Sequence, residues 1–221
     1  MKKRALVIGA SGGIGRALST ELVARGYAVT GLSRSADGFD LTRAGAVEAA
    51  LAGLSPDYDL ILVASGILTG GAERPEKSLR EVTAEEMAAQ FAVNAIGPAL
   101  VLRHAARLFP RDRRAVFAAL SARVGSIGDN RAGGWYSYRT SKAALNQIIH
   151  TGAIELARTH MQAICVALHP GTVATEFTAG FPSHHKHTPD AAAGHLLSVL
   201  DGLTQEDSGQ FFDWKGERVP W

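Results

Sequence analysis

Gly9-Ala10-Ser11-Gly12-Gly13-Ile14-Gly15 is the stretch that decides the fold. It lies between a short apolar run, residues 4–8, and a segment of helical periodicity, residues 16–25. A second apolar run follows at residues 27–32, so strand, glycine loop, helix and strand form a βαβ unit. Loop glycines allow backbone N–H groups to approach a pyrophosphate at a helix N-terminus. We therefore predict that a dinucleotide binds at Gly9, Ser11, Gly12, Gly13, Ile14 and Gly15. The alternative, a flexible N-terminal turn, fits the flanking strand and helix less well.

Strand-like and helical segments alternate along the rest of the chain. No linker, internal repeat or low-complexity segment interrupts them. Alternating β and α units predict a parallel sheet covered on both faces. We expect an α/β chain with a single domain spanning residues 1–221, with a Rossmann-like doubly wound fold and one parallel seven-stranded sheet.

The composition excludes several classes of protein. The chain has 221 residues, of which 46% are hydrophobic and 20% charged, and its net charge is +2, so we expect no nucleic-acid partner. No apolar run approaches the ~20 residues that span a bilayer, and the run after Lys2-Lys3-Arg4 is too short for a signal peptide. Cys165, the single cysteine, lies in an apolar run and predicts a buried structural thiol. We expect a cytoplasmic protein with no membrane partner.

The end of the second apolar run distinguishes the two nicotinamide cofactors. An acidic residue there would bind a ribose 2′-hydroxyl, but the sequence has Ser33-Arg34-Ser35. Ser33 offers a hydroxyl and Arg34 a planar guanidinium suited to a phosphate, with Arg16 able to assist. We predict NADP(H) rather than NAD(H); the alternative is a solvated surface arginine. Asp40, followed by Leu41, can reach an adenine amino group; alternatively, Thr42 or Asp40 caps the next helix.

Two further segments carry candidate ligand contacts. Ala64-Ser65-Gly66 ends a strongly apolar strand, where small residues leave room for a ligand. Asn94 precedes Gly97-Pro98 inside an apolar helical segment, and such local violations tend to mark functional sites. Alternatively, Gly97-Pro98 merely separates two helices.

Tyr138 and Lys142 lie one helical turn apart, so both side chains occupy one face of the helix. A phenol titrates near pH ~10, and a nearby positive charge lowers that pKa. The spacing therefore suits a general acid/base pair. Taken alone, it also fits a surface helix with a solvated lysine.

Together these motifs resemble those of the short-chain dehydrogenase/reductase family, and the resemblance spans essentially the whole chain. The stretch from Gly125 to Arg139 resembles the C-factor and sniffer-type carbonyl reductase branch. The matching pieces are the Gly9/Gly13/Gly15 loop, Asp40, Ala64-Ser65-Gly66, Asn94-Ala95-Ile96-Gly97, Tyr138-x-x-x-Lys142 and Pro170-Gly171-x-Val173-x-Thr175.

The resemblance implies roles for these residues. Tyr138 would exchange a proton with a carbonyl or alcohol oxygen, and Lys142 would hold the nicotinamide ribose and lower the pKa of the phenol. Asn94 would fix a proton-relaying water. The segment with Pro170, Gly171, Val173 and Thr175 would hold the carboxamide of the nicotinamide. The implied activity is NADP(H)-dependent interconversion of a carbonyl and an alcohol.

One departure from the family pattern concerns the serine that would bond the substrate oxygen. Ala122 stands at its place when the chain is aligned on Gly125. Ser121 is one residue earlier and Ser126 lies just beyond Gly125. Both remain candidates for the missing hydroxyl. A dinucleotide-binding regulatory or signalling protein with little turnover is therefore the alternative function.

The remaining predictions concern the substrate loop and assembly. His184 and His187 lie three residues apart, but a substrate lid is favoured over a metal site. Phe177 and Phe181 predict a partly apolar pocket for a small-molecule substrate. The helical segments 84–107 and 138–160 resemble the family's dimer-forming pair, so we expect a homodimer or homotetramer. Their apolar residues fit an intradomain core equally well.

Overall fold

The computed structural model describes residues 2–180 and 185–221. The described residues form one parallel sheet with the strand order β2-β1-β3-β4-β5-β6. The parallel Rossmann-like sheet is confirmed, but the prediction of seven strands is one too many. The six apolar runs of the sequence each form one strand of the described sheet, and no further run of strand length joins it. The strands are β1 (Arg4–Ile8), β2 (Ala28–Leu32), β3 (Leu60–Val63), β4 (Ala115–Leu120), β5 (Ala163–His169) and β6 (Phe211–Asp213).

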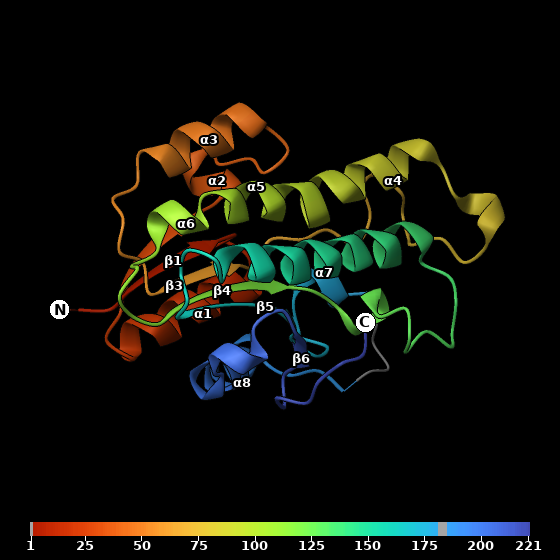
Figure 1. Ribbon diagram of the computed structural model, residues 1–221. Coiled ribbons are helices and arrows are strands. Elements are labelled where there is room, and N and C mark those ends of the chain that lie inside the picture. Colours follow the sequence, from red (N-terminus) through yellow and green to blue (C-terminus); the bar gives the residue numbers. More distant parts are fainter. Residues whose placement is uncertain (1, 181–184) are drawn as a thin grey trace.

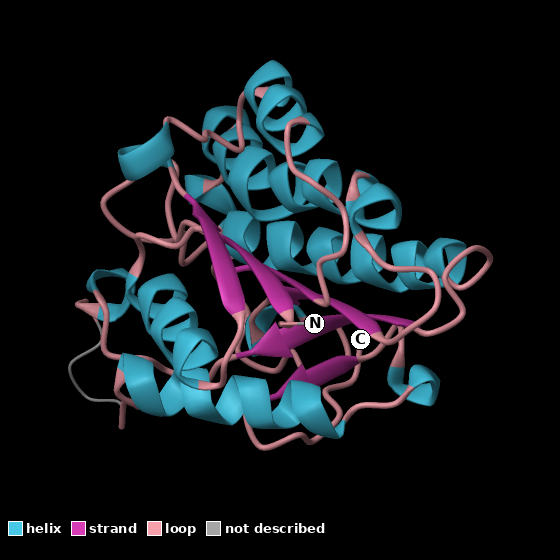
Figure 2. Ribbon diagram, turned by 90° about the vertical axis from the view of Figure 1, so that its left-hand side faces the viewer, coloured by secondary structure: helices cyan, strands magenta, loops and turns pink. Residues whose placement is uncertain are grey.

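Helices cover both faces of this sheet (Figures 1 and 2). One face packs against α1 and α8, which also contact each other, and the other against α3, α5, α6 and α7. The helices are α1 (Gly13–Ala24), α2 (Arg34–Asp37), α3 (Ala44–Ala52), α4 (Ala84–Phe91), α5 (Gly97–Arg103), α6 (Ala105–Leu108), α7 (Tyr136–Leu156) and α8 (Pro189–Gly202).

The central strand β4 shows how the sequence divides the core into two layers. All six of its residues are buried, so it reads as a continuous apolar run. Its odd-numbered residues, such as Phe117, pack with α5 and α7, whereas its even-numbered residues, such as Val116, pack with α1 and α8. This alternation follows from the two-residue period of a strand. It also determines which way the residues just after β4 point.

The strand order reverses direction at β1, because β2 lies on one side of it and β3 on the other. In open parallel sheets, ligands bind outside the carboxyl ends of the strands at such a point. The segments that follow β1, β2, β3, β4 and β5 all leave from this edge because every strand pair is parallel. The candidate residues scattered along the sequence therefore converge on one side of the sheet.

A π-helical turn, Ala92–Ile96, joins α4 to α5 into one rod. Pro98 stands at the start of α5, where its missing N–H and its ring disturb a regular helix. A π-turn is a common adjustment at such a position and often marks a functional site. Gly97-Pro98 thus produces a local bulge at Asn94 rather than two separate helices.

We expect Gly97→Ala to destabilise the protein. A Cβ at Gly97 would lie 2.7 Å from the Cβ of Leu41, a distance that forces the backbone to shift. The free energy of unfolding, measured by urea denaturation, should fall by about 1–3 kcal/mol. Gly194→Ala is the matched control, because Gly194 lies inside α8 and a Cβ added there would meet nothing within 4 Å. That variant should gain about 0.5–1 kcal/mol; equal effects of both substitutions would contradict the role of Leu41 packing.

Candidate active site

The glycine loop forms a tight turn between β1 and α1. Gly9 has φ +84°, and a side chain on Gly15 would collide with the Gly9 carbonyl. A Cβ on Gly13 would lie 2.6 Å from the Cγ2 of Thr175. The turn therefore requires glycine at these positions, and it brings the loop against the segment that follows β5.

The N-terminus of α1 suits an anionic group. Gly12 is its N-cap with no side-chain cap, Gly13 is exposed, and the first turn contains no acidic residue. Unpaired backbone N–H groups and the helix dipole both favour a negative charge there. The exposed Ser11 and the half-buried Ile14 complete the loop. These features would suit the pyrophosphate of a dinucleotide, and the assignment of these residues to it stays a prediction.

At the end of β2, the carboxylate of Asp37 lies next to Ser33. Ser33 is buried, and its hydroxyl accepts a hydrogen bond from the backbone N–H of Ala36. The Asp37 carboxylate accepts the Ser33 backbone N–H at 2.9 Å and lies 3.4 Å from its hydroxyl. Arg34 is exposed at the start of α2. A phosphate at this point would meet the Arg34 guanidinium but also compete with Asp37 for Ser33.

Asp40 stabilises its own turn. Its Oδ1 accepts the N–H and the hydroxyl of Thr42 at 2.9 and 2.8 Å. The bond from the Thr42 backbone N–H lowers the pKa of Asp40 most, and the bond from the Thr42 hydroxyl lowers it further, so this pKa lies below its usual value. Leu41 is buried against Gly97. Of the two expectations for Asp40, the structure thus shows capping of a turn that precedes α3.

Lys142 is the centre of the site. Its side chain is 3% exposed, and Nζ donates a hydrogen bond of 2.8 Å to the Leu120 carbonyl at the end of β4. A Cβ on Gly66 would lie 3.5 Å from Nζ and 3.3 Å from the Asn94 Oδ1. Asn94, fully buried, accepts the Ile67 N–H and donates to the Ile67 carbonyl, both at 2.9 Å. The segment 64–67 is therefore held next to the lysine.

Tyr138 lies under two aromatic rings. Trp135 meets it edge-on with ring centroids 6.1 Å apart, and Phe177 lies 5.9 Å away. The Lys142 Nζ lies 5.9 Å from the centroid of the phenol. Burial raises the pKa of Tyr138 above its usual value and lowers that of Lys142 to about 7. The lowering of the phenol pKa that Lys142 was expected to cause is not found in this structure, because burial of the phenol raises its pKa.

Each of the two candidate serines has a hydrogen-bond partner other than Tyr138. Ser121 continues the odd-numbered face of β4, and its hydroxyl donates to the Asn146 Oδ1 at 2.6 Å. Asn146 lies eight residues after Tyr138, about 12 Å further along α7. The Ser126 hydroxyl accepts the Asp129 backbone N–H at 3.0 Å and stabilises a local turn. Ala122 is half-buried and has an extended backbone.

The segment after β5 is fixed by backbone pairing. The Ala174 N–H donates to the His187 carbonyl, and the His187 N–H donates to the Thr172 carbonyl, both at 2.9 Å. Val173 between them is buried, and Gly171 has φ +74°. Pro170, Gly171, Val173 and Thr175 therefore form an ordered edge facing the glycine loop through Thr175.

The imidazole rings of His187 and His195 pack against each other and against the indole of Trp214. His187 lies 4.3 Å from Trp214 and 5.4 Å from His195, between ring centroids. Within residues 2–180 and 185–221, no group of three or more potential ligands is arranged to hold a metal ion. His184 and Phe181 lie outside the described residues.

Two residues that the sequence did not single out anchor the start of α7. Glu76 is 3% exposed, and its carboxylate accepts the backbone N–H and the hydroxyl of Ser137. Arg139 donates to the carbonyls of Gly133, Gly134 and Val124. No sequence pattern indicates Glu76, because its partner lies 61 residues away. The two glycines before the helix were the only available signal for an unusual turn.

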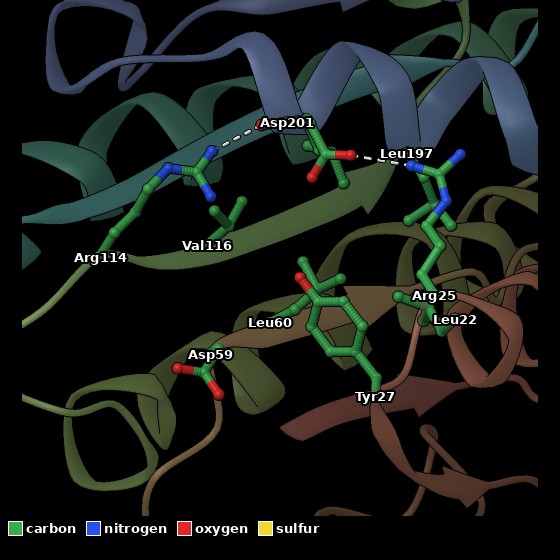
Figure 3. A pocket seen from close by; sticks show the side chains of 10 residues that line it. Leu22, Arg25, Tyr27, Asp59, Leu60, Arg114, Val116, Leu197 and Asp201 are labelled. Atoms are coloured by element: carbon green, nitrogen blue, oxygen red, sulfur yellow. Dashed lines mark hydrogen bonds and ion pairs between the residues drawn. The ribbon is translucent and has the colours of Figure 1, made fainter. Parts of the chain in front are cut away.

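A small cavity lies at the opposite, amino-terminal edge of the sheet (Figure 3). Its volume is about 20 Å³, room for about one water molecule. Arg25 and Asp201 close it with an ion pair of 2.8 Å, and Arg114 donates to the Leu200 carbonyl. This cavity is too small for a cofactor or substrate.

Of the helices in the described ranges, none is both long and apolar enough to cross a membrane.

The fold and the site together indicate the class of protein. A glycine loop at the switch point of a parallel sheet, next to a buried Lys142 and Tyr138, is the arrangement of a dinucleotide-binding protein of the Rossmann type. The comparisons with known proteins agree with this class.

A family model described as enoyl-(acyl carrier protein) reductase matches residues 9–210. The C-signal protein of Myxococcus xanthus is 39% identical over 147 residues, covering 65% of this chain and 84% of that relative. A 1-hydroxy-2-glutathionyl-2-methyl-3-butene dehydrogenase of Rhodococcus sp. strain AD45 is 33% identical over 235 residues, covering 98% of each. A solved short-chain dehydrogenase/reductase from Burkholderia multivorans with bound NADP has a TM-score of 0.82 and 26% identity, and all of both chains is covered.

The chain belongs to the short-chain dehydrogenase/reductase family of oxidoreductases. The family predicted from the motifs is thus confirmed, together with its carbonyl reductase-like branch.

Lys142 should make stability depend on pH. Its pKa is about 7 in the folded protein and about 10.4 in an unfolded chain. Between these values the unfolded chain binds a proton that the folded protein releases, so stability rises with pH from about 7 to about 10. Lys142→Met should flatten this rise in urea denaturation of the cofactor-free protein at pH 7 and 9.5. The exposed Lys2→Met variant is the control, and an unchanged slope in Lys142→Met would contradict the shifted pKa.

Proposed function

We propose that this protein is an NADP(H)-dependent oxidoreductase that interconverts a carbonyl and an alcohol on a small organic substrate. The observation that carries the proposal is the buried Lys142, placed within reach of Tyr138, Gly66 and Asn94 at the ligand-binding edge of the sheet. The Burkholderia structure with bound NADP supports the cofactor, and the Rhodococcus dehydrogenase supports the reaction type.

Residues of the described edge would hold the cofactor. The glycine loop binds the pyrophosphate at the N-terminus of α1, and Arg34 binds the 2′-phosphate. Asp40 and Leu41 flank the adenine, and Ala64, Ser65 and Gly66 leave room for the cofactor backbone. Pro170, Gly171, Val173 and Thr175 hold the carboxamide. The nicotinamide, when bound, supplies or accepts the hydride.

Tyr138 is the general acid in the reducing direction and the base in the reverse direction. Its raised pKa keeps the phenol protonated at neutral pH, ready to donate to a carbonyl oxygen. Lys142, with a pKa of about 7, occupies both protonation states near neutral pH and can pass a proton toward Tyr138. Asn94 holds the Ile67 segment beside Lys142, and on the family pattern it also fixes the relaying water.

The alternative is a dinucleotide-binding regulatory or signalling protein with little turnover. Two observations favour it: Ala122 stands where the family's serine is expected, and the C-signal protein is a relative. In either case the partner is a small molecule. We also propose a cytoplasmic homodimer or homotetramer, supported by the exposed Ile96 and Ile154 on the helical rod and α7.

Tyr138→Phe should abolish turnover and leave cofactor binding intact. The variant lacks the hydroxyl that moves the proton, so kcat for reduction of a panel of aldehydes and ketones should fall by at least about a hundredfold. NADPH binding, measured by quenching of tryptophan fluorescence, should stay within twofold of the wild type. A wild-type protein that binds NADPH but reduces no carbonyl in the panel would support the regulatory alternative instead.

NADPH should bind more tightly than NADH, because the Arg34 guanidinium pairs with the 2′-phosphate. Arg34→Ala should reduce that preference by about tenfold, since a hydrogen bond to a charged group is lost. Fluorescence titration with both cofactors measures it, with the exposed Arg80→Ala variant as a control for loss of charge. Equal or tighter binding of NADH by the wild type would contradict the assignment.

A further inference from the structure

We propose that the rings of His187, His195 and Trp214 form a latch that fixes residues 171–175 at neutral pH and loosens them in acid, so that dinucleotide binding weakens. The effect on binding rests on the proposed function, which places residues 171–175 against the nicotinamide. The loosening itself does not depend on that function.

The latch contacts the segment after β5 through both backbone and side chains. Val173 and His187 form a parallel bridge, in which the N–H groups of Ala174 and His187 are the donors. A Cβ on Gly171 would lie 2.9 Å from the Cδ1 of Trp214 and 3.1 Å from the Cδ2 of His187. Gly171 therefore lies directly on two of the three rings, so a displacement of His187 also displaces this segment.

The three rings of the latch come from three different parts of the fold. His187 precedes α8, His195 lies inside α8, and Trp214 follows β6. The ring centroid of Trp214 lies 4.3 Å from that of His187 and 5.0 Å from that of His195, and the two imidazoles are 5.4 Å apart. His185 adds a further imidazole 5.7 Å from His187. Uncharged rings pack favourably at such distances.

The charged forms of these imidazoles fit the latch poorly. Among the described histidines, His104 is the one that forms an ion pair, so the latch has no carboxylate partner. The buried Nδ1 of His195 has no hydrogen-bond partner among the described residues. Burial lowers the pKa of His187 below its usual value, and the proximity of His195 and then of His185 lowers it further. Proton uptake therefore favours separation of the rings.

The cations around the latch add positive charge. The Lys215 ammonium lies 5.3 Å from the ring centroid of Trp214. Lys186 directly precedes His187, and its ammonium donates to the Thr178 carbonyl at 2.6 Å. A proton on His187 is therefore added to surroundings that are already positive.

The carboxylates on the elements around the latch are exposed or paired elsewhere. Asp190 in the first turn of α8 and Glu176 after β5 are both exposed. Asp213 forms an ion pair of 3.2 Å with Arg123. His169 continues the odd-numbered face of β5, which packs toward α7 on the other side of the sheet. None of these groups offsets a charge on the latch by an ion pair.

The direction of the pH effect follows from the proton balance. His187 has a lowered pKa when the latch is packed and the usual value of about 6.5 when the ring is in water. The packed latch therefore binds fewer protons than the loosened one. Its stability is fully present above about pH 6.5 and is lost as the pH falls through the lowered pKa.

Hydrogen exchange of the full-length protein measures the latch directly. Between about pH 7.5 and about pH 5.5, the amide of Ala174 should lose protection by about tenfold after correction for the intrinsic exchange rate. His187→Phe keeps a ring that cannot be protonated, so its loss should be less than about twofold. His195→Phe removes the neighbouring charge and should also reduce the loss. His104→Gln is the control, because it removes a histidine paired with Glu48 and should behave like the wild type.

Titration with NADPH tests the consequence for the cofactor. Over the same pH range, Kd should rise about tenfold more in the wild type than in His187→Phe. The comparison cancels the titration of Lys142 and of the 2′-phosphate, because both proteins share them.

The latch is overturned if the wild type and both Phe variants lose protection equally, or if the wild type loses none. An equal pH dependence of NADPH binding in the wild type and His187→Phe also overturns the proposal, since the latch then does not act on the cofactor. If the wild type binds no NADPH at either pH, the proposed function fails. The latch then stands if Ala174 loses protection in the wild type but not in His187→Phe, and otherwise it falls.

Discussion

The burial of Lys142 is the constraint on which the site depends. An ammonium without water needs a hydrogen-bond acceptor, and the carbonyl of Leu120 at the end of β4 provides one. This bond ties α7 to the central strand at the edge where every strand ends. The same burial lowers the lysine pKa to about 7, so the contact that organises the site also makes its proton exchangeable near neutral pH.

The other buried groups of the site follow from this placement. Asn94 and Lys142 both lie beside Gly66, and the π-turn at Ala92–Ile96, which packs against α7, places Asn94 there. Its amide bonds both the Ile67 backbone and the Ser141 hydroxyl, so one side chain joins the segment after β3 to α7. A buried amide with these partners carries little desolvation penalty. The residue that we propose for the proton path therefore also connects two elements of the fold.

The sequence predicted the convergence of the site but not its contacts. Periodicity and glycine spacing are local signals, and they located the glycine loop, the π-turn segment and the Tyr138–Lys142 helix. The buried carboxylate of Glu76 had no local signal, because its role depends on Ser137 across a loop. The direction of the Tyr138 pKa shift depends on how fully the phenol is desolvated, which spacing alone does not give. The strand count was too high because the sequence contains six apolar runs of strand length, and each forms one strand.

The left-handed backbone at Trp135 and the alanine at position 122 are two unusual features of the site. A left-handed bulky residue costs about 1–3 kcal/mol, and buried bonds from Glu76 and Arg139 offset it. At position 122 the chain lacks a hydroxyl that would orient a substrate oxygen, and Ser121 cannot replace it because the strand alternation turns it toward Asn146. On the proposed function, Tyr138 therefore acts on the substrate oxygen without the serine partner of the family pattern.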